Sequence, residues 1–100
     1  MIEIKHSPRI ITISGHAGYA PHGQDIVCAS ISALTQVFIA SVKELTNDNL
    51  KCDIRAGNTR IQYGNLSERG QVLLDSFLFG IELIADSYPN NVRIDQVLKS

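Results

Sequence analysis

The sequence has little cysteine and no excess of charge of either sign. Its 100 residues include two cysteines, nine Lys and Arg residues and ten Asp and Glu residues, for a formal net charge of -1. Two cysteines far apart, Cys28 and Cys52, argue against a disulfide framework and favour free thiols in a reducing cytoplasm. Because the basic residues are scattered, there is no electrostatic footprint for direct nucleic-acid binding.

Targeting segments and long hydrophobic runs are also missing. The N-terminal residues MIEIKH lack the basic-then-apolar layout of an export signal. Ser and Gln interrupt the apolar stretch Ile26–Leu45, so we expect no membrane-spanning segment and no membrane partner. With 44% hydrophobic and 19% charged residues, the composition is that of an ordinary globular protein. We expect residues 1–100 to form a single cytoplasmic domain.

Hydrophobic periodicity predicts an α+β fold. The expected elements, in order, are strands at 2–5 and 10–13, a helix between Asp25 and Asn47, a hairpin of 50–56 and 59–63 around Gly57-Asn58, a helix from Ser67 to Tyr88 and a short edge strand at 92–94. The result is a small, mainly antiparallel sheet in ββαββα order with two helices packed on one face.

The first expected helix is apolar on two faces. One face carries Val27, Ile31, Leu34, Phe38, Val42 and Leu45, and the other carries Ile26, Ala33, Val37 and Ala40. A helix of this kind is either buried between layers or used at a contact between subunits. We therefore hypothesise that the chain forms a homodimer.

A candidate nucleophile stands at the start of this helix. With Asp25 as the N-cap, Cys28 is the third helical residue, where free N–H groups and the helix dipole favour a thiolate. His16 ends the preceding strand, and the loop can fold back so that its imidazole pairs with the sulfur and shuttles protons. His22 competes for this role, but a loop histidine beside Pro21 is more often solvated.

Two further polar residues have double interpretations. Ser32 lies one helical turn after Cys28 and can hydrogen-bond the sulfur or a substrate group, or simply its own helix backbone. Asp25 can orient the imidazole, although the cap alone is the favoured interpretation.

The loop between strand and helix is rich in glycine. Gly15, Gly18 and Gly23 permit a positive φ and favour a mobile lid over an ordinary connection. A metal site formed by His16, His22 and Cys28 is disfavoured, because the spacings do not match common zinc sites. Cys52 lies in an apolar strand and is interpreted as packing.

Two long segments carry a resemblance to a known family. The stretch GHAGYAPHGQDIVCASISAL resembles the signature of the ribosomal-processing cysteine protease family, known as Prp, and QVLLDSFLFGIELIADSYPNNVRI resembles its last helix. Together they cover most of the chain. The sequence departs from the family at Ser30, where glycine or alanine is usual, and at Pro21-His22, which replaces an acidic or aromatic pair.

The resemblance implies a cytoplasmic, homodimeric cysteine endopeptidase without a cofactor. Its substrate would be the short N-terminal extension of a large-subunit ribosomal protein, cut after an aromatic-ended hydrophobic segment, or a phage structural protein. The family's histidine and cysteine correspond to His16 and Cys28, and its supporting aspartate and serine to Asp25 and Ser32. We expect helix-start N–H groups, including that of Cys28, to stabilise the oxyanion. The rival hypothesis is a non-catalytic dimeric module that binds a ribosomal or phage protein, with Cys28 only packed.

Overall fold

The computed structural model of the chain describes residues 1–21 and 23–96. Its elements are β1 (Ile2–Ser7), β2 (Ile10–Ser14), α1 (Ile26–Leu45), β3 (Leu50–Arg55), β4 (Asn58–Tyr63), α2 (Glu68–Ser87) and β5 (Val92–Gln96). The predicted ββαββα order is confirmed, and the predicted edge strand is β5. The tip of the hairpin lies at Ala56-Gly57, one residue earlier than expected, because Arg55 pairs with Asn58.

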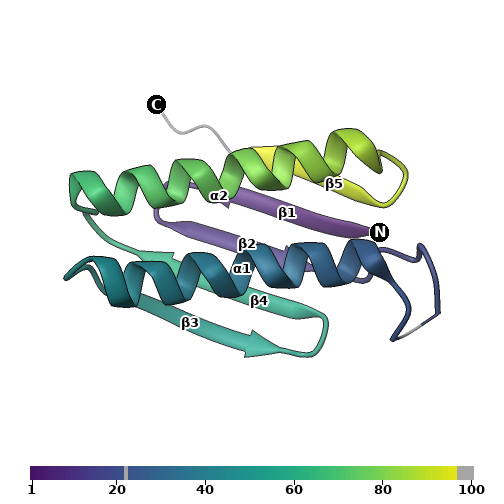
Figure 1. Ribbon diagram of the computed structural model, residues 1–100, viewed down its shortest axis with the longest axis horizontal. Coiled ribbons are helices and arrows are strands. Elements are labelled where there is room, and N and C mark those ends of the chain that lie inside the picture. The colour runs from purple at the N-terminus through teal and green to yellow at the C-terminus, as the bar shows by residue number, and fades with distance from the viewer. Residues whose placement is uncertain (22, 97–100) are drawn as a thin grey trace.

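The sheet is mixed, with strands in the order β3-β4-β2-β1-β5. Every neighbouring pair is antiparallel except β1 and β5, which are parallel. These pairings make β2 parallel to β3 and β4 parallel to β5, and parallel strands need a crossover connection. The two helices are those crossovers, and both cover the same face of the sheet (Figure 1), as predicted.

The hydrophobic core lies between this face and the two helices. Ile4, Ile11 and Ile61 come from three adjacent central strands, and each is 0% exposed. Between the helices, the rings of Phe38 and Phe77 stack with their centroids 4.9 Å apart. The β-branched strand residues and the helical spacing of the apolar positions therefore bury one continuous apolar layer.

The second apolar face of α1 stays exposed. Ile26 is 52% and Val37 is 62% exposed, and Ala33 and Ala40 are exposed as well. The sequence-based expectation that Ser and Gln make Ile26–Leu45 unsuited to span a membrane needs correction. α1 has 20 residues, and an 18-residue window of it has a mean hydropathy of 1.7, so by length and composition it is long and apolar enough to cross a membrane. A core helix meets the same criterion, and Val27 and Val42 of α1 are buried in this core.

Candidate active site at the start of helix α1

A cleft of about 660 Å³ opens beside the first turns of α1. Two parts of the chain that are distant in the sequence form most of it: the loop after β2 with the adjoining start of α1, and the β3–β4 turn. The residues predicted for the site that line it are Gly15, His16, Gly18, Gly23, Asp25, Cys28 and Ser32. The fold thus brings together every predicted site residue that the structure describes; His22 lies outside the described residues.

Asp25 ties the loop to the helix through both carboxylate oxygens. Its Oδ1 accepts the backbone N–H groups of Val27 and Cys28, each at 3.0 Å, which is the geometry of an N-cap. Its Oδ2 accepts the N–H groups of Tyr19 at 3.0 Å and Ala20 at 3.4 Å. The hydrogen bond from Cys28 and those from the other three N–H groups lower the pKa of Asp25, outweighing partial desolvation. Asp25 therefore stays ionised at neutral pH.

Cys28 is the third residue of α1, and its thiol is half-buried. Its Sγ accepts the backbone N–H of Ala17 at 3.3 Å. The N–H of Cys28 itself, expected from the sequence to stabilise an oxyanion, is instead donated to Asp25. The N–H of Cys28 is engaged by the carboxylate of the N-cap residue Asp25. The backbone N–H that donates to the sulfur is that of Ala17, which lies in the loop.

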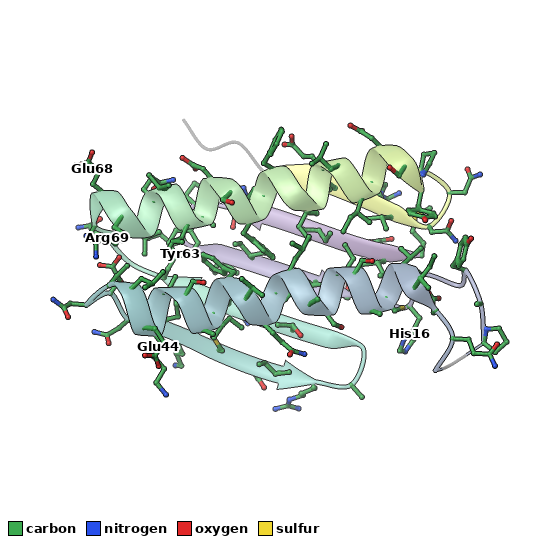
Figure 2. All side chains as sticks on the ribbon, viewed as in Figure 1. His16, Glu44, Tyr63, Glu68 and Arg69 are labelled. Carbon is green, nitrogen blue, oxygen red and sulfur yellow. The ribbon has the colours of Figure 1, made fainter. Side chains whose placement is uncertain are left out.

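β2 ends at Ser14, so His16 lies two residues beyond the strand and does not end it as predicted; its side chain is exposed to the cleft. Figure 2 shows its ring beside the first turns of α1, on the side of the β3–β4 turn. The N–H of Gly15 donates to the carbonyl of Gly57 at 2.9 Å, which fastens the loop to that turn. Gly15 has a φ of 91°, and a Cβ there would strike the carbonyl of Met1, so this position requires glycine.

Ser32 lines the same cleft and is exposed, one turn after Cys28. Gly18 and Gly23 lie in the loop as predicted, and each has a positive φ. Opening of this loop as a lid stays a prediction. The loop is held at several points, including an edge-to-face contact between Tyr19 and Tyr88 with ring centroids 5.3 Å apart.

Sequence reasoning missed the β3–β4 side of the cleft. Ile54, Ala56 and Thr59 line it together with Gly57. The positions of these residues in the sequence do not indicate a site. They reach the cleft because β4 pairs with β2 in the sheet, which brings the β3–β4 turn close to the loop after β2. Ile54 is 64% exposed because β3 is an edge strand.

The other cysteine behaves as predicted. Cys52 is half-buried against the core, and this burial raises the pKa of its thiol. A metal centre has no support in the described part of the chain, where no group of three or more His, Cys, Asp and Glu side chains is placed to hold an ion.

The sequence is similar to that of a known protein family. The family model described as "Cysteine protease Prp" matches residues 1–93. Among curated relatives, the ribosomal processing cysteine protease Prp of Bacillus subtilis is 26% identical over 89 residues, covering 82% of this chain and 80% of that protein. The protein of the same name from Mycoplasma genitalium is 29% identical over 100 residues, covering 96% of each.

A solved structure shows the same fold. The essential ribosomal processing protease Prp of Staphylococcus aureus, solved with a covalently linked product peptide, is similar with a TM-score of 0.92. The two are 23% identical, and the similarity covers 97% of this chain and 100% of that one.

Proposed function

This chain belongs to the cysteine protease Prp family, and we propose that it cleaves peptide bonds with Cys28 as the nucleophile and His16 as its acid–base partner. The resemblance noted in the sequence is thereby confirmed, and the chain is a cysteine peptidase. The observation that carries the residue assignment is the cleft itself. His16 and Cys28 both line it, and a backbone N–H donates to the sulfur.

The reaction runs in two steps. The Cys28 thiolate attacks the scissile carbonyl carbon and forms a C–S bond. The C–N bond then breaks, and the His16 imidazolium gives its proton to the leaving amine. In the second step water loses a proton to His16 and attacks the thioester, and the C–S bond breaks to restore the thiolate and the imidazolium. Water is consumed, and two peptide fragments leave.

Charge in this reaction develops beside the Ala17 amide. The N–H of Ala17 stabilises the Cys28 thiolate before attack, because a donor favours the charged form of an acceptor. Once sulfur is bonded to carbon, the same N–H is free for the oxyanion on that carbon. It replaces the Cys28 amide, which Asp25 occupies. Ser32 lines the cleft one turn away and positions a substrate group.

The apolar part of the cleft supports a hydrophobic peptide as substrate. Ile13, Ile31 and Ile54 line it from a strand, the helix and the edge of the sheet. Such a surface favours a hydrophobic peptide. The curated relatives are named ribosomal processing proteases. The proposed substrate is the one that the family resemblance implies: the N-terminal extension of a large-subunit ribosomal protein, cut in the cytoplasm after an aromatic-ended hydrophobic segment. A phage structural protein is the other source of such a segment.

A homodimer is part of this proposal, through the exposed face of α1. Val37 lies at its middle and is 62% exposed. Val37→Lys is expected to convert a dimer to a monomer in light scattering at micromolar concentration. Val72→Lys serves as the control on α2, because Val72 is similarly exposed at 61%. A monomeric wild type would refute the dimer.

Cleavage of a peptide with an aromatic-ended ribosomal leader tests the residue assignment. Cys28→Ala is expected to lower kcat/KM by at least about 1000-fold, and His16→Ala by about 100-fold or more. Cys52→Ala is the matched control and should cleave at the wild-type rate. Cleavage by Cys28→Ala at the wild-type rate would remove Cys28 as the nucleophile.

The substrate and the rival module need their own measurements. After this protein is depleted from cells, mass spectrometry should find a ribosomal protein that keeps its N-terminal extension. Ribosomal proteins that are all cut normally would favour a phage structural protein as the substrate. Iodoacetamide should label Cys28 fast and in a pH-dependent way below pH 7. Equal, slow labelling of Cys28 and Cys52 would favour the non-catalytic module.

A further inference from the structure

Asn91 lies between the end of α2 and β5, and three of its polar groups are engaged. Its backbone N–H donates to the carbonyl of Tyr88 at 2.9 Å, and its carbonyl accepts the N–H of Ile2 at 2.8 Å. Its side-chain Nδ2 donates to the carbonyl of Ala17 at 2.9 Å. The two backbone bonds fix Asn91 to the helix end and to β1, so its amide is a rigid donor.

Ala17 accepts this hydrogen bond and in turn donates one to Cys28. Its side chain is 3% exposed and packs in the core. Its carbonyl is held by Asn91, and its N–H donates to Sγ of Cys28 at 3.3 Å. The next residue, Gly18, has a φ of 69° and little intrinsic preference between backbone conformations. The carbonyl belongs to the Ala17–Gly18 peptide and the N–H to the His16–Ala17 peptide, and the two units share the Cα of Ala17. Without the Asn91 bond, the backbone on both sides of this Cα has more freedom to rotate.

We infer that Asn91 is a positioning residue for the Cys28 thiolate, acting through the backbone of Ala17. This inference rests on the proposed function. Fixing the Ala17 backbone keeps its N–H aimed at the sulfur and, later, at the oxyanion. A donor held in place before the reaction stabilises developing charge without reorganisation. Loss of the Asn91 amide therefore weakens thiolate stabilisation and catalysis while leaving the substrate cleft intact.

Two control positions separate this role from simple tethering of the loop. Tyr19 packs against Tyr88 and fastens the same loop to the same corner, but it makes no bond to the Ala17 peptide. Tyr19→Ala therefore loosens the loop and keeps the Asn91 bond. Asn90 is the exposed neighbour of Asn91, so Asn90→Ala and Asn90→Asp control for composition and for added charge.

The experiment compares peptide cleavage and cysteine alkylation in these variants. Asn91→Asp keeps the shape of the side chain and removes the donor, and Asn91→Ala removes both. Each is expected to lower kcat by about tenfold or more with KM nearly unchanged, because the Ala17 N–H would be less well aimed and its hydrogen bond to the charged sulfur and oxyanion weaker. Each should also move the pH profile of Cys28 alkylation to higher pH and leave that of Cys52 in place. His16, Asp25 and Arg55, the other ionisable groups lining the cleft, are the same in all variants.

Three outcomes decide between the possibilities. A wild type that cleaves, with Asn91 variants indistinguishable from Asn90 variants, overturns the inference alone. If Tyr19→Ala lowers kcat as much as Asn91→Asp does, and the alkylation of Cys28 and Cys52 changes alike, Asn91 only tethers the loop. That result also overturns the inference. A wild type that does not cleave and whose Cys28 labels no faster than Cys52 overturns the proposed function itself.

A measurement on the wild type covers variants that fail to fold. NMR should show the side-chain amide protons of Asn91 shifting over the same pH range as Cys28 alkylation. Those of Asn90 should stay still, and the Asn91 shift should vanish in Cys28→Ala. Asn91 signals that do not respond to this titration contradict the inference, whatever the variants do.

Discussion

The imidazole of His16 lies against the backbone of Gly57. A Cβ at Gly57 would stand 3.2 Å from Nε2 of His16, closer than ordinary van der Waals contact. Gly57 also has a φ of 72°, and its carbonyl accepts the N–H of Gly15. The β3–β4 turn therefore packs against the His16 ring and supports it from one side.

Gly57→Ala tests the contact between this turn and the His16 ring. The new Cβ should displace the His16 ring and lower kcat/KM by about tenfold, since a small misplacement of a proton-transfer group is costly. The positive φ should also lower the free energy of unfolding by about 1 kcal/mol. Steady-state kinetics and thermal melting measure the two effects separately.

Gly64→Ala is the control for Gly57→Ala. A Cβ at Gly64 would meet no atom within 4 Å, and the residue is exposed, so this variant should keep its activity. Wild-type activity in Gly57→Ala would mean that the His16 ring does not depend on the turn.

Asp25→Asn tests the carboxylate that joins loop and helix. The folded state lowers the pKa of Asp25, chiefly through the hydrogen bond from Cys28. The stability this contributes is present above the unfolded-state pKa of about 3.9 and is lost as pH falls through the lower folded-state pKa. Thermal melting should show the wild type more stable than Asp25→Asn at neutral pH. The two should converge below about pH 4. A gap that stays constant into strong acid would contradict the assignment.

His6 also predicts a stability that falls with falling pH, but nearer to neutral pH than for Asp25. Burial lowers the pKa of His6, whose Nε2 lies 3.1 Å from the hydroxyl of Tyr63. The unfolded chain then binds a proton more readily than the folded one between the lowered pKa and about 6.5. Stability should therefore fall as pH drops below about 6.5, and melting of His6→Gln should show a smaller fall. A pH dependence identical in the two proteins would contradict this prediction.

Ile81 tests the core that holds α2 on the sheet. It is 0% exposed, so Ile81→Ala should lower the free energy of unfolding by about 2–5 kcal/mol through lost burial and a cavity. Leu83 is on the same helix and is 53% exposed, so Leu83→Ala should cost much less. Urea denaturation measures both. Equal losses would mean that α2 buries a different face.

The local elements could be predicted from the sequence because local physics sets them. The helix from Ser67 to Tyr88 shows this, since Ser67 caps its first turn and Tyr88 its last. Alternating isoleucines similarly identified β1, and the β-branched run 10–13 identified β2. The expectation based on interruptions was wrong for Ile26–Leu45, which is long and apolar enough by composition to cross a membrane. Ser and Gln lower the mean hydropathy too little to offset the many apolar residues of this helix, some of which form its core face.

The candidate site divides along the same line. His16, Asp25, Cys28 and Ser32 lie within one strand-loop-helix segment, so cap geometry and helical spacing were enough to group them. Gly57 and Asn91 were beyond such reasoning. Asn91 is 74 residues from Ala17 in the chain, and no local pattern relates residues so far apart.

The sequence by itself determined the helix cap, the strand pattern and the residues that meet at the start of α1, because each depends on neighbours a few positions away. Only the tertiary structure decided which N–H faces the sulfur, what the imidazole rests on and which side chain steadies the loop. These depend on strand order and on a parallel β1–β5 edge closed by a helical crossover. Contacts of that kind arise when the whole sheet assembles, so no short stretch of residues encodes them.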